Sequence, residues 1–410
     1  MDPLKVLVCG GGCAGPALAY WLARSGHQVT VIERFPVLRV AGSQIDLRGA
    51  GIEAANRMGL LDTIRGKLVD EAGSVLVDSQ GNAKGKIMAN NSGKGAQSFT
   101  SEYEIMRGDL VCILYEATKD NVEYIFDKSV ELFEQDDNQV TVTFSDGSSD
   151  TFDLLVGADG QGSRIRKAIL PPGTPDPYFR FGYHVAYWFV PRSEGDDNMM
   201  NVYHCPGGRM IIRRSHSAAE SQVMCFLRDS SPKLCSIPKA SMDKQKEFWT
   251  QQFRDAGWQA ERFLEGMKTT DKWYCQEVVQ VRTETWSKGR VVLLGDAAYC
   301  PSPFSGMGTS AALVGAYILA GEISQHGDDF PQAFANYDKN LRPFVKEVQQ
   351  VNLFLLKLGM PDTWWGIAIL HFIFQTICFF KIPKLLSRFM KEKDGDWQLP
   401  DYPELKAADK

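Results

Sequence analysis

Short apolar runs that end in glycine alternate with helical patterns over much of this chain. The run from Leu4 to Cys9 predicts a strand, the pattern from about Pro16 to Ser25 predicts a helix, and Gln28 to Ile32 predicts a second strand. Two more buried strands, Asp153 to Val156 and Val291 to Leu294, also lead into glycine. This order of elements indicates an α/β fold with a parallel sheet.

Weaker helical and strand patterns lie between these elements. Helices are predicted over residues 51–58, 109–118, 241–256 and 308–323, and strands over residues 122–126, 131–135 and 139–144. The chain from about residue 333 is mostly helical. Residues 84–95 are rich in glycine, asparagine and lysine and predict a mobile loop.

The pattern changes near Pro171 and Pro172. Aromatic and β-branched residues then alternate with polar ones over residues 181–190, 199–204, 210–214 and 222–228. Alternation with a period of two is typical of antiparallel strands that have one buried face. The sequence therefore predicts a second domain, built on an antiparallel sheet and inserted into the first.

The C-terminal region contains a long apolar run from Gly366 to Phe380. Its 15 residues are fewer than the ~20 that a membrane-spanning helix needs. Pro383 and a basic stretch follow, with Lys381, Lys384, Arg388, Lys391 and Lys393. Three interpretations stay open: a helix that closes a pocket, contact with a membrane surface, or a true span.

Composition narrows the class of protein. A formal net charge of −5 gives no basic field for nucleic acid. None of the nine cysteines forms a CxxC pair and the six histidines are scattered, so we expect reduced thiols, a cytoplasmic protein and no metal site. The first apolar run has no basic region before it and no cleavage site after it, so no signal peptide is expected.

A dinucleotide-binding fingerprint lies between the first strand and the first helix. Gly10, Gly12 and Gly15 match GxGxxG, in which the glycines allow a tight turn, a close approach of a pyrophosphate and close packing of helix on strand. Glu33 ends the second strand, where a carboxylate accepts hydrogen bonds from ribose hydroxyls. The alternative is a glycine-rich turn without a ligand.

Two later motifs distinguish FAD from NAD as the nucleotide. The strand from Asp153 leads to Asp159-Gly160, and the strand from Val291 leads to Gly295-Asp296 and a proline- and glycine-rich turn. Asp296 can accept bonds from ribityl hydroxyls. The amides of residues 306–309, at a helix N-terminus, can bond the edge of a flavin ring.

These three motifs, in this order, resemble the class A flavoprotein aromatic hydroxylases, the group of para-hydroxybenzoate hydroxylase. Residues 42–49, 106–110 and 295–319 are closer to the tetracycline-inactivating monooxygenases and to related fungal and bacterial natural-product monooxygenases. Two positions depart from the wider pattern. Tyr299 stands where the family often has His, and Met307 stands where it often has Gln, which removes a side-chain amide near the flavin.

The motifs and the resemblance together predict the cofactor site. Arg39, Asp46, Arg107, Asp159 and Gly160 enter it through the resemblance alone; for Arg107 the alternative is a surface residue at a helix start, and for Asp159 a turn former. The complete predicted set is Gly10, Gly12, Cys13, Ala14, Gly15, Glu33, Arg34, Arg39, Asp46, Arg107, Asp159, Gly160, Gly295, Asp296, Pro303, Gly306, Met307, Gly308 and Thr309.

The predicted architecture is α/β, with a Rossmann-like FAD-binding domain of the glutathione-reductase type. This domain is discontinuous and comprises residues 1–73, 101–175 and 275–340. A substrate-binding domain with an inserted antiparallel sheet comprises residues 74–100 and 176–274, and a C-terminal helical segment comprises residues 341–410.

The resemblance implies a monooxygenase that uses NAD(P)H, with NADPH favoured, and O2. The reduced flavin would react with oxygen to form a C4a-hydroperoxide, which oxygenates a medium-sized aromatic or polyketide-like compound. No catalytic side chain is named, because the flavin carries the chemistry, and the sequence has no GxSxG or HExxH motif. The alternatives are a flavin-dependent reductase or dehydrogenase without oxygen insertion, and a flavoprotein that only binds a small molecule.

The substrate pocket is expected between the inserted sheet and the flavin. Its candidate residues are His184, Trp188, Tyr203, Arg213 and Phe226 on the sheet and Phe304 on the loop after Asp296. For each of them the alternative is ordinary packing. The expected partners are the organic substrate, O2 and NAD(P)H, with no nucleic acid. We expect a monomer and leave peripheral membrane contact through the C-terminal segment open.

Overall fold

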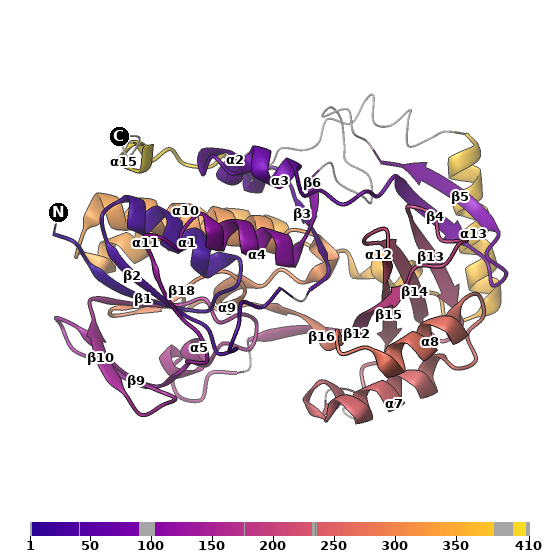
Figure 1. Ribbon diagram of the computed structural model, residues 1–410, viewed down its shortest axis with the longest axis horizontal. Helices are drawn as coiled ribbons and strands as arrows, with labels where there is room; N and C mark the ends of the chain where they lie inside the picture. The colour runs from indigo at the N-terminus through magenta and orange to yellow at the C-terminus, as the bar shows by residue number, and fades with distance from the viewer. Residues whose placement is uncertain are drawn as a thin grey trace.

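The computed structural model describes residues 2–40, 42–89, 103–175, 177–231, 234, 236–380 and 397–406. Figure 1 shows two halves side by side: an α/β half that holds both ends of the chain, and a half built on a twisted antiparallel sheet. Mixed α/β architecture with a parallel sheet, antiparallel sheets and C-terminal helices was predicted, and the structure confirms it. The domain boundaries themselves stay a prediction.

A six-stranded sheet forms the core of the α/β half, in the order β17-β18-β11-β1-β2-β7. Its strands are β1 (Lys5–Cys9), β2 (Gln28–Ile32), β7 (Glu123–Ile125), β11 (Leu154–Gly157), β17 (Ser287–Lys288) and β18 (Val291–Leu293). All pairs are parallel except β17 with β18. The central strands are mainly apolar and largely buried because both faces of the sheet are covered.

Four helices cover one face of this sheet (Figure 1). They are α1 (Ala14–Arg24), α4 (Arg107–Glu116), α10 (Gly308–His326) and α11 (Phe330–Val348). The small sheet of β8 (Val130–Gln135), β9 (Val140–Phe144) and β10 (Ser149–Phe152) lies on the other side with α5 (Arg164–Ile169). Short helices complete the half: α2 (Ala50–Arg57), α3 (Leu61–Arg65), α9 (Asp296–Tyr299), η2 (Pro303–Ser305) and α15 (Pro403–Lys406).

A seven-stranded sheet forms the second half, in the order β16-β12-β15-β14-β13-β4-β5. Its strands are β4 (Gly73–Val77), β5 (Ala83–Met88), β12 (Tyr178–Pro191), β13 (Met199–Cys205), β14 (Arg209–Ser215), β15 (Glu220–Arg228) and β16 (Tyr274–Val281). Only the β13–β4 pair is parallel. The short η1 (Ile237–Lys239) precedes the helices α7 (Met242–Phe253) and α8 (Ala260–Thr269).

Side chains alternate between the two faces of this sheet, and the strand register fixes which residues share a face. Trp188 and its cross-strand neighbour Val223 pack with α7 and α8, and we call this the helix face. Tyr187 and its neighbour Met224 belong to the opposite face, which contacts Phe304 of the α/β half. We call this second face the cofactor face, because the sequence predicts the cofactor on the side of Phe304.

The structure corrects one element of the sequence prediction and adds others. Residues 84–95 were predicted as a mobile loop, but β5 occupies Ala83–Met88 as an edge strand paired with β4. The prediction for residues 90–95 lies outside the described residues. A two-stranded ribbon of β3 (Gln44–Leu47) and β6 (Tyr103–Met106), together with β4, α8 and β16, was not predicted.

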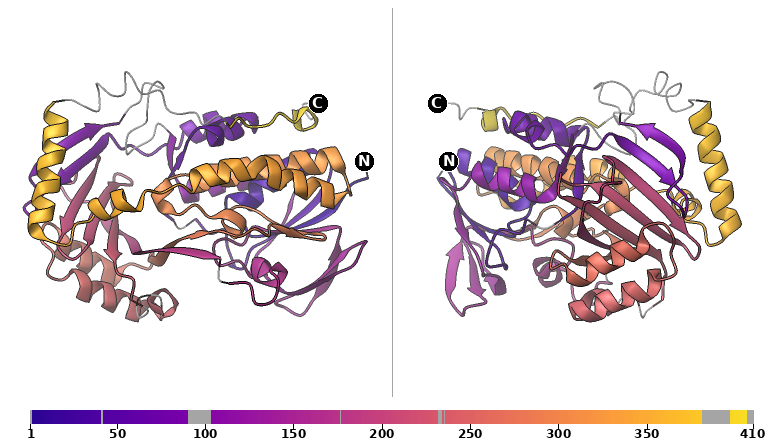
Figure 2. Two further views of the ribbon diagram at one scale, coloured as in Figure 1. Left: turned by 180° about the vertical axis from the view of Figure 1, so that it is seen from behind. Right: turned by 45° about the vertical axis from the view of Figure 1, so that its right-hand side comes forward.

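The C-terminal helices lie on the cofactor face. Leu356, on α12 (Leu353–Leu358), packs in the same cluster as Tyr183. The helix α13 (Trp364–Phe379) runs beside β5 at the far end of the sheet, as both views in Figure 2 show. A methyl group on Gly85 of β5 would lie 2.7 Å from the ring of Phe374. Within the described ranges, no helix combines the length and apolarity needed to cross a bilayer.

The last described segment, residues 397–406, returns to the α/β half. Tyr402 is buried there against α10, where its ring occupies the space above Gly321. The Tyr402 hydroxyl donates to Glu322 Oε1 at 2.6 Å, and the Tyr402 amide donates to the Tyr317 hydroxyl at 3.1 Å. After α13, which packs on the second half, this segment therefore belongs again to the core of the α/β half.

We predict that Tyr402→Ala lowers the free energy of unfolding by about 3–5 kcal/mol, because it leaves a cavity above Gly321. Tyr402→Phe keeps the ring and removes only the bond to Glu322, so it should cost about 1–3 kcal/mol. Urea unfolding followed by circular dichroism measures both. Equal stability of the wild type and Tyr402→Ala would contradict the role of this segment.

Candidate cofactor and substrate site

The turn between β1 and α1 requires glycine at two positions. Gly10 has a φ of 123°, and a methyl group on it would lie 2.4 Å from the Ala158 carbonyl oxygen. A methyl group on Gly15 would lie 2.0 Å from the Gly10 carbonyl oxygen. Only backbone fits in these spaces, so helix and strand approach closely, and no side chain caps the start of α1 at Cys13 and Ala14.

Glu33 lies beside this turn at the end of β2. Its Oε2 accepts a hydrogen bond from the Gly11 amide at 2.9 Å, and its Oε1 accepts one from the Phe35 amide at 3.1 Å. These bonds fix the carboxylate next to the glycine turn, where the sequence predicted it. Arg34, the next residue, is exposed, and its guanidinium lies over the Phe35 ring.

The turn after β18 meets the turn after β1. A methyl group on Gly295 would lie 2.9 Å from Ala14 Cβ. Motifs that are 281 residues apart (295 − 14) are therefore in contact. Asp296 starts α9, its side chain is exposed, and its Oδ1 would lie 4.0 Å from a methyl group on Gly308 at the start of α10; we call the space between these turns the cleft. Desolvation by the cleft walls raises the pKa of Asp296, while a hydrogen bond with Cys300 and the nearby Arg107 oppose the shift.

Arg107 lies on the other side of the glycine turn. It starts α4, and its Nη2 would be 3.3 Å from a methyl group on Gly12. Gly42 packs on its aliphatic part, and its Nη1 donates to the Arg39 carbonyl oxygen at 3.4 Å. The Arg39 guanidinium in turn lies 5.2 Å from the Tyr274 ring of the second half.

The Asp159-Gly160 turn has a structural role that is visible in the contacts. Asp159 Oδ2 accepts from the Arg164 amide at 2.7 Å at the start of α5, while Oδ1 is buried without a protein partner. Arg166, which is absent from the predicted set, is fully buried and donates to the Ala297 carbonyl oxygen at 2.8 Å. It thereby joins this turn to α9.

The N-terminus of α10 completes the cleft. Pro303 starts η2, Gly306 is in the left-handed region with a φ of 65°, and Met307 precedes the first helical turn. No side chain caps this helix, so the amides of Gly308 and Thr309 at its start can donate hydrogen bonds to a ligand. A methyl group on Gly306 would lie 3.6 Å from Asp46 Oδ2, which places β3 beside the turn.

These groups fit FAD by their chemistry. Two carboxylates can accept from ribose and ribityl hydroxyls, and two helix N-termini and Arg107 favour the negative charge of a pyrophosphate and of a flavin ring edge. The buried oxygens Asp46 Oδ1 and Asp159 Oδ1 have no protein partner among the described residues, as expected for groups that a ligand satisfies. In the described ranges no group of three or more His, Cys, Asp or Glu side chains is arranged to hold a metal ion.

The structure directs four of the six substrate candidates away from this cleft. His184, Trp188, Tyr203 and Arg213 belong to the helix face, so the prediction that they face the flavin is wrong for them. Trp188 Nε1 donates to the Phe263 carbonyl oxygen at 2.9 Å, and Arg213 Nη1 donates to the Asp197 carbonyl oxygen at 2.9 Å.

The other two displaced residues are also engaged elsewhere. The Tyr203 ring lies 5.9 Å from that of Trp258. His184 is buried, and desolvation lowers its pKa, with Asp229 opposing the shift. The physical reason for all four errors is the two-residue period: an aromatic or basic side chain one position out of phase points to the other side of the sheet.

Phe226 lies on the cofactor face, Phe304 packs against this face from η2, and the role of both residues in binding substrate stays a prediction. The Phe304 ring lies 5.1 Å from the Tyr183 ring and 6.2 Å from the Phe226 ring. Sequence reasoning missed the residues in phase with Phe226. They line the same face and are Tyr187, Met210, Ile212 and Met224. The sequence could have identified Met224, because residues 224 and 226 on one strand must share a face.

Comparisons with known proteins agree with this geometry. The family described as FAD binding domain matches residues 3–351. The FAD-dependent monooxygenase asL6 of Sarocladium schorii is 38% identical over 420 residues, covering 98% of this chain and 99% of its own. The crystal structure of tetracycline destructase Tet(51) has a TM-score of 0.78 and 31% identity, covering 98% of this chain and 100% of its own.

A more distant structure shows the fold alone. Klebsiella pneumoniae HpxO, crystallised with FAD and uric acid, has a TM-score of 0.70 at 20% identity and covers 94% of this chain and 96% of its own. Fold, cleft and comparisons together define a class A flavoprotein monooxygenase. The chain belongs to the family of FAD-dependent monooxygenases, an assignment that the resemblance of its motifs predicted. It is an oxidoreductase with FAD as its cofactor, and the use of NAD(P)H and O2 is typical of the family.

We predict that Asp296→Asn weakens FAD binding by about 10–100-fold, because a charged acceptor of a hydrogen bond contributes about 1.5–3 kcal/mol. Titration of FAD into the apoprotein, followed by quenching of flavin fluorescence, measures the Kd. Asp243→Asn, on α7 in the other half, is the matched control and should bind FAD as the wild type does. An unchanged Kd for Asp296→Asn would remove this residue from the cofactor site.

Proposed function

We propose that FAD lies across the cleft, with its nucleotide end at Gly10–Gly15 and Glu33, its ribityl chain at Asp296 and its ring at the start of α10. The contact between Gly295 and Ala14 carries this proposal, because it brings the two motifs into one cleft. When bound, the flavin accepts reducing equivalents from NAD(P)H and activates O2. The remaining cofactor residues of the predicted set belong to the same proposal.

The substrate, in this proposal, is a medium-sized aromatic or polyketide-like compound that lies against the cofactor face. The face combines aromatic rings with flexible methionines, and both kinds of side chain suit a flat apolar molecule. The task of these residues is to hold the molecule and to exclude water from the cleft. The name of one similar protein supports this class, since Tet(51) is a tetracycline destructase.

We predict that Phe226→Leu raises the KM for the oxygenated substrate by about tenfold, because it removes part of one wall of the site. Cys225→Ala, one residue away on the helix face, is the matched control and should lower stability without changing KM. A screen of aromatic and polyketide compounds, which follows NADPH oxidation and peroxide release together, first identifies the substrate. The proposal fails if both variants keep the wild-type KM.

The same screen distinguishes the alternative function. Product made under labelled O2 should carry one labelled oxygen atom, which mass spectrometry detects. A reductase or dehydrogenase would give an unlabelled product with the same NADPH consumption. Faster oxidation with NADPH than with NADH would support the proposed choice of co-substrate, and gel filtration would test the predicted monomer.

We also propose that the protein is cytoplasmic and that α13 contacts a membrane surface. The helix has no charged residue, and its outer stripe is apolar: Phe372 is 69% exposed, and Trp365, Ile369 and Ile373 are exposed beside it. Residues 364–391 contain no Asp or Glu and four Lys or Arg, which favours anionic lipid. The predicted basic stretch itself, residues 381–393, lies outside the described residues. All eight cysteines in the described part are free, which suits a reducing compartment.

We predict that wild-type protein sediments with vesicles of phosphatidylcholine and phosphatidylglycerol. The double variant Trp365→Ser with Phe372→Ser should bind at least tenfold more weakly, because each aromatic side chain buried in lipid contributes about 1.5–3 kcal/mol. Leu132→Ser, which removes a side chain that is 58% exposed in the other half, is the matched control. Wild-type protein that stays in the supernatant contradicts the proposal, and sedimentation without vesicles would indicate self-association instead.

A further inference from the structure

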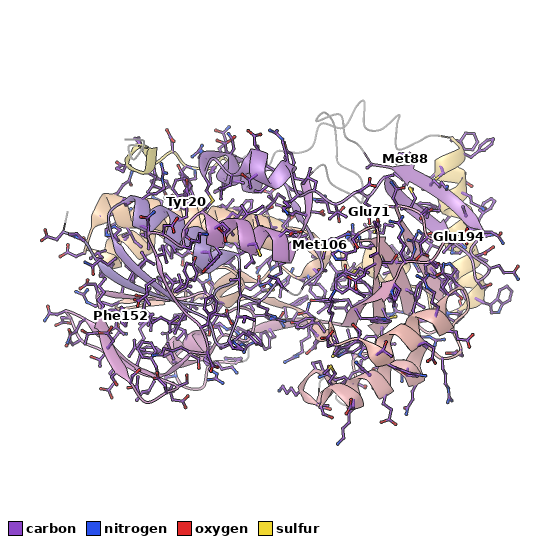
Figure 3. The ribbon with its side chains drawn as sticks, viewed as in Figure 1. Tyr20, Glu71, Met88, Met106, Phe152 and Glu194 are labelled. Carbon is purple, nitrogen blue, oxygen red and sulfur yellow. The ribbon has the colours of Figure 1, made fainter. Side chains whose placement is uncertain are left out.

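A cluster of charges lies where the two halves of the molecule meet, with Glu71 and Glu104 buried and Asp46 and Arg48 partly buried. It contains three carboxyl groups, Glu71, Glu104 and Asp46, and two guanidinium groups, Arg214 and Arg48. Figure 3 labels Glu71 at this junction, close to Met106 at the end of the strand that carries Glu104. None of these residues except Asp46 has a place in the site described above.

Arg214 is shared by two of the carboxyl groups. Its Nη2 donates to Glu71 Oε1 at 2.7 Å and its Nε donates to Glu71 Oε2 at 3.1 Å, which is a bidentate pair. The same Nη2 also contacts Glu104 Oε1. The side chains of Glu71 and Glu104 are 1% and 5% exposed, so water contributes little to stabilising a second negative charge.

Asp46 faces Glu104 across the β3–β6 ribbon. The two residues are direct partners in the strand register, so their side chains lie on the same face of the ribbon. Asp46 Oδ2 accepts from Arg48 Nη2 at 2.9 Å, whereas Oδ1 is buried without a protein partner. Asp46 Oδ2 also lies beside the Gly306 turn that precedes α10.

The charges of this cluster do not balance when every group is ionised. Three carboxylates and two guanidiniums leave one negative charge in a buried place, and Glu71 and Asp46 already have their own arginine partners. A proton on the third carboxyl group removes the excess charge. Desolvation raises the pKa of Glu104 to about 8, with Arg214 opposing the shift and Glu71 and Asp46 adding to it.

We propose that Glu104 is a neutral carboxylic acid in the resting protein and that it holds a proton for the flavin site, which it passes to Asp46. In the transfer the O–H bond of Glu104 breaks, an O–H bond forms on Asp46, and Glu104 remains as a carboxylate on Arg214. No electrons change hands in this step. Solvent later returns a proton to Glu104.

The overall reaction of a hydroxylating monooxygenase has a use for this proton. Substrate, O2, NAD(P)H and one proton give hydroxylated product, NAD(P)⁺ and water, so each turnover consumes a proton. A cleft that excludes water needs a fixed group to supply it. The inference rests on the proposed function for this role, whereas the protonation state of Glu104 can be measured without substrate or NAD(P)H.

Infrared spectroscopy tests the protonation state directly. At pH 7 the wild type should show a protonated-carboxyl C=O band that shifts in D2O and is absent in Glu104→Gln. Glu71→Gln should also lose this band, because Glu104 would then be the only carboxylate on Arg214 and would ionise. Glu53→Gln, on the exposed side of α2, is the control and should keep the band.

The pH dependence of stability gives a second readout. Because the folded pKa of Glu104 is about 8 and the ordinary value is 4.5, the folded protein holds the extra proton between these values. Its stability should therefore fall as the pH rises through this window, and the Tm of Glu104→Gln should fall less than that of the wild type. In the holoenzyme, the high-pH side of the kcat profile, where wild-type Glu104 loses its proton, should change for Glu104→Gln while KM stays within twofold.

A wild-type band that persists in Glu104→Gln would overturn the inference, and so would a wild type without any band. If Glu104→Gln does not fold, a titration of the wild-type band serves instead, and the band should disappear near pH 8. A protein that shows the band but inserts no oxygen would refute the proposed function and leave the protonation state of Glu104 standing.

Discussion

The close approach of backbone to backbone at the glycine turns is the constraint on which the cleft depends. Gly15 leaves no room for a side chain above the Gly10 carbonyl, and Gly295 leaves no room above Ala14. These contacts draw the ends of β1, β11 and β18 together at one edge of the parallel sheet. Two carboxylates and two helix N-termini then face the same space, because carboxyl ends of parallel strands meet at one edge.

The antiparallel sheet contributes its two faces to different tasks. The helix face, with Trp188 at its centre, is an ordinary apolar core under α7 and α8. The cofactor face combines an apolar area around Phe304 with an ionic cluster around Arg214. A buried ion pair adds little net stability, because removing its charges from water costs about as much free energy as pairing them returns. We therefore attribute the cluster to a chemical role.

Much of the first half follows from its sequence, because apolar runs that end in glycine have few other interpretations. The strands at Lys5–Cys9 and Leu154–Gly157 agree with their predicted bounds to within a residue. The edge strand Ala83–Met88 was missed, since two lysines and a glycine hide its alternation. Substrate candidates chosen by residue type alone fell on both faces, whereas the strand phase of Phe226 would have selected one. The Arg214–Glu104 contact joins residues 110 positions apart, which no local pattern reveals.

The interruption of the first sheet also sets an order for folding during synthesis. Strand β18 pairs with β11, but 133 residues separate them (291 − 157 − 1), and nearly the whole second sheet lies in that interval. The ribosome therefore releases the strands β12 to β16 before the last parallel strand exists. The second half has its own core and can form first, whereas the glycine turn after β1 meets its partner only when residues 291–309 have been made. A flavin that binds both turns would consequently be captured only after the second sheet has left the ribosome.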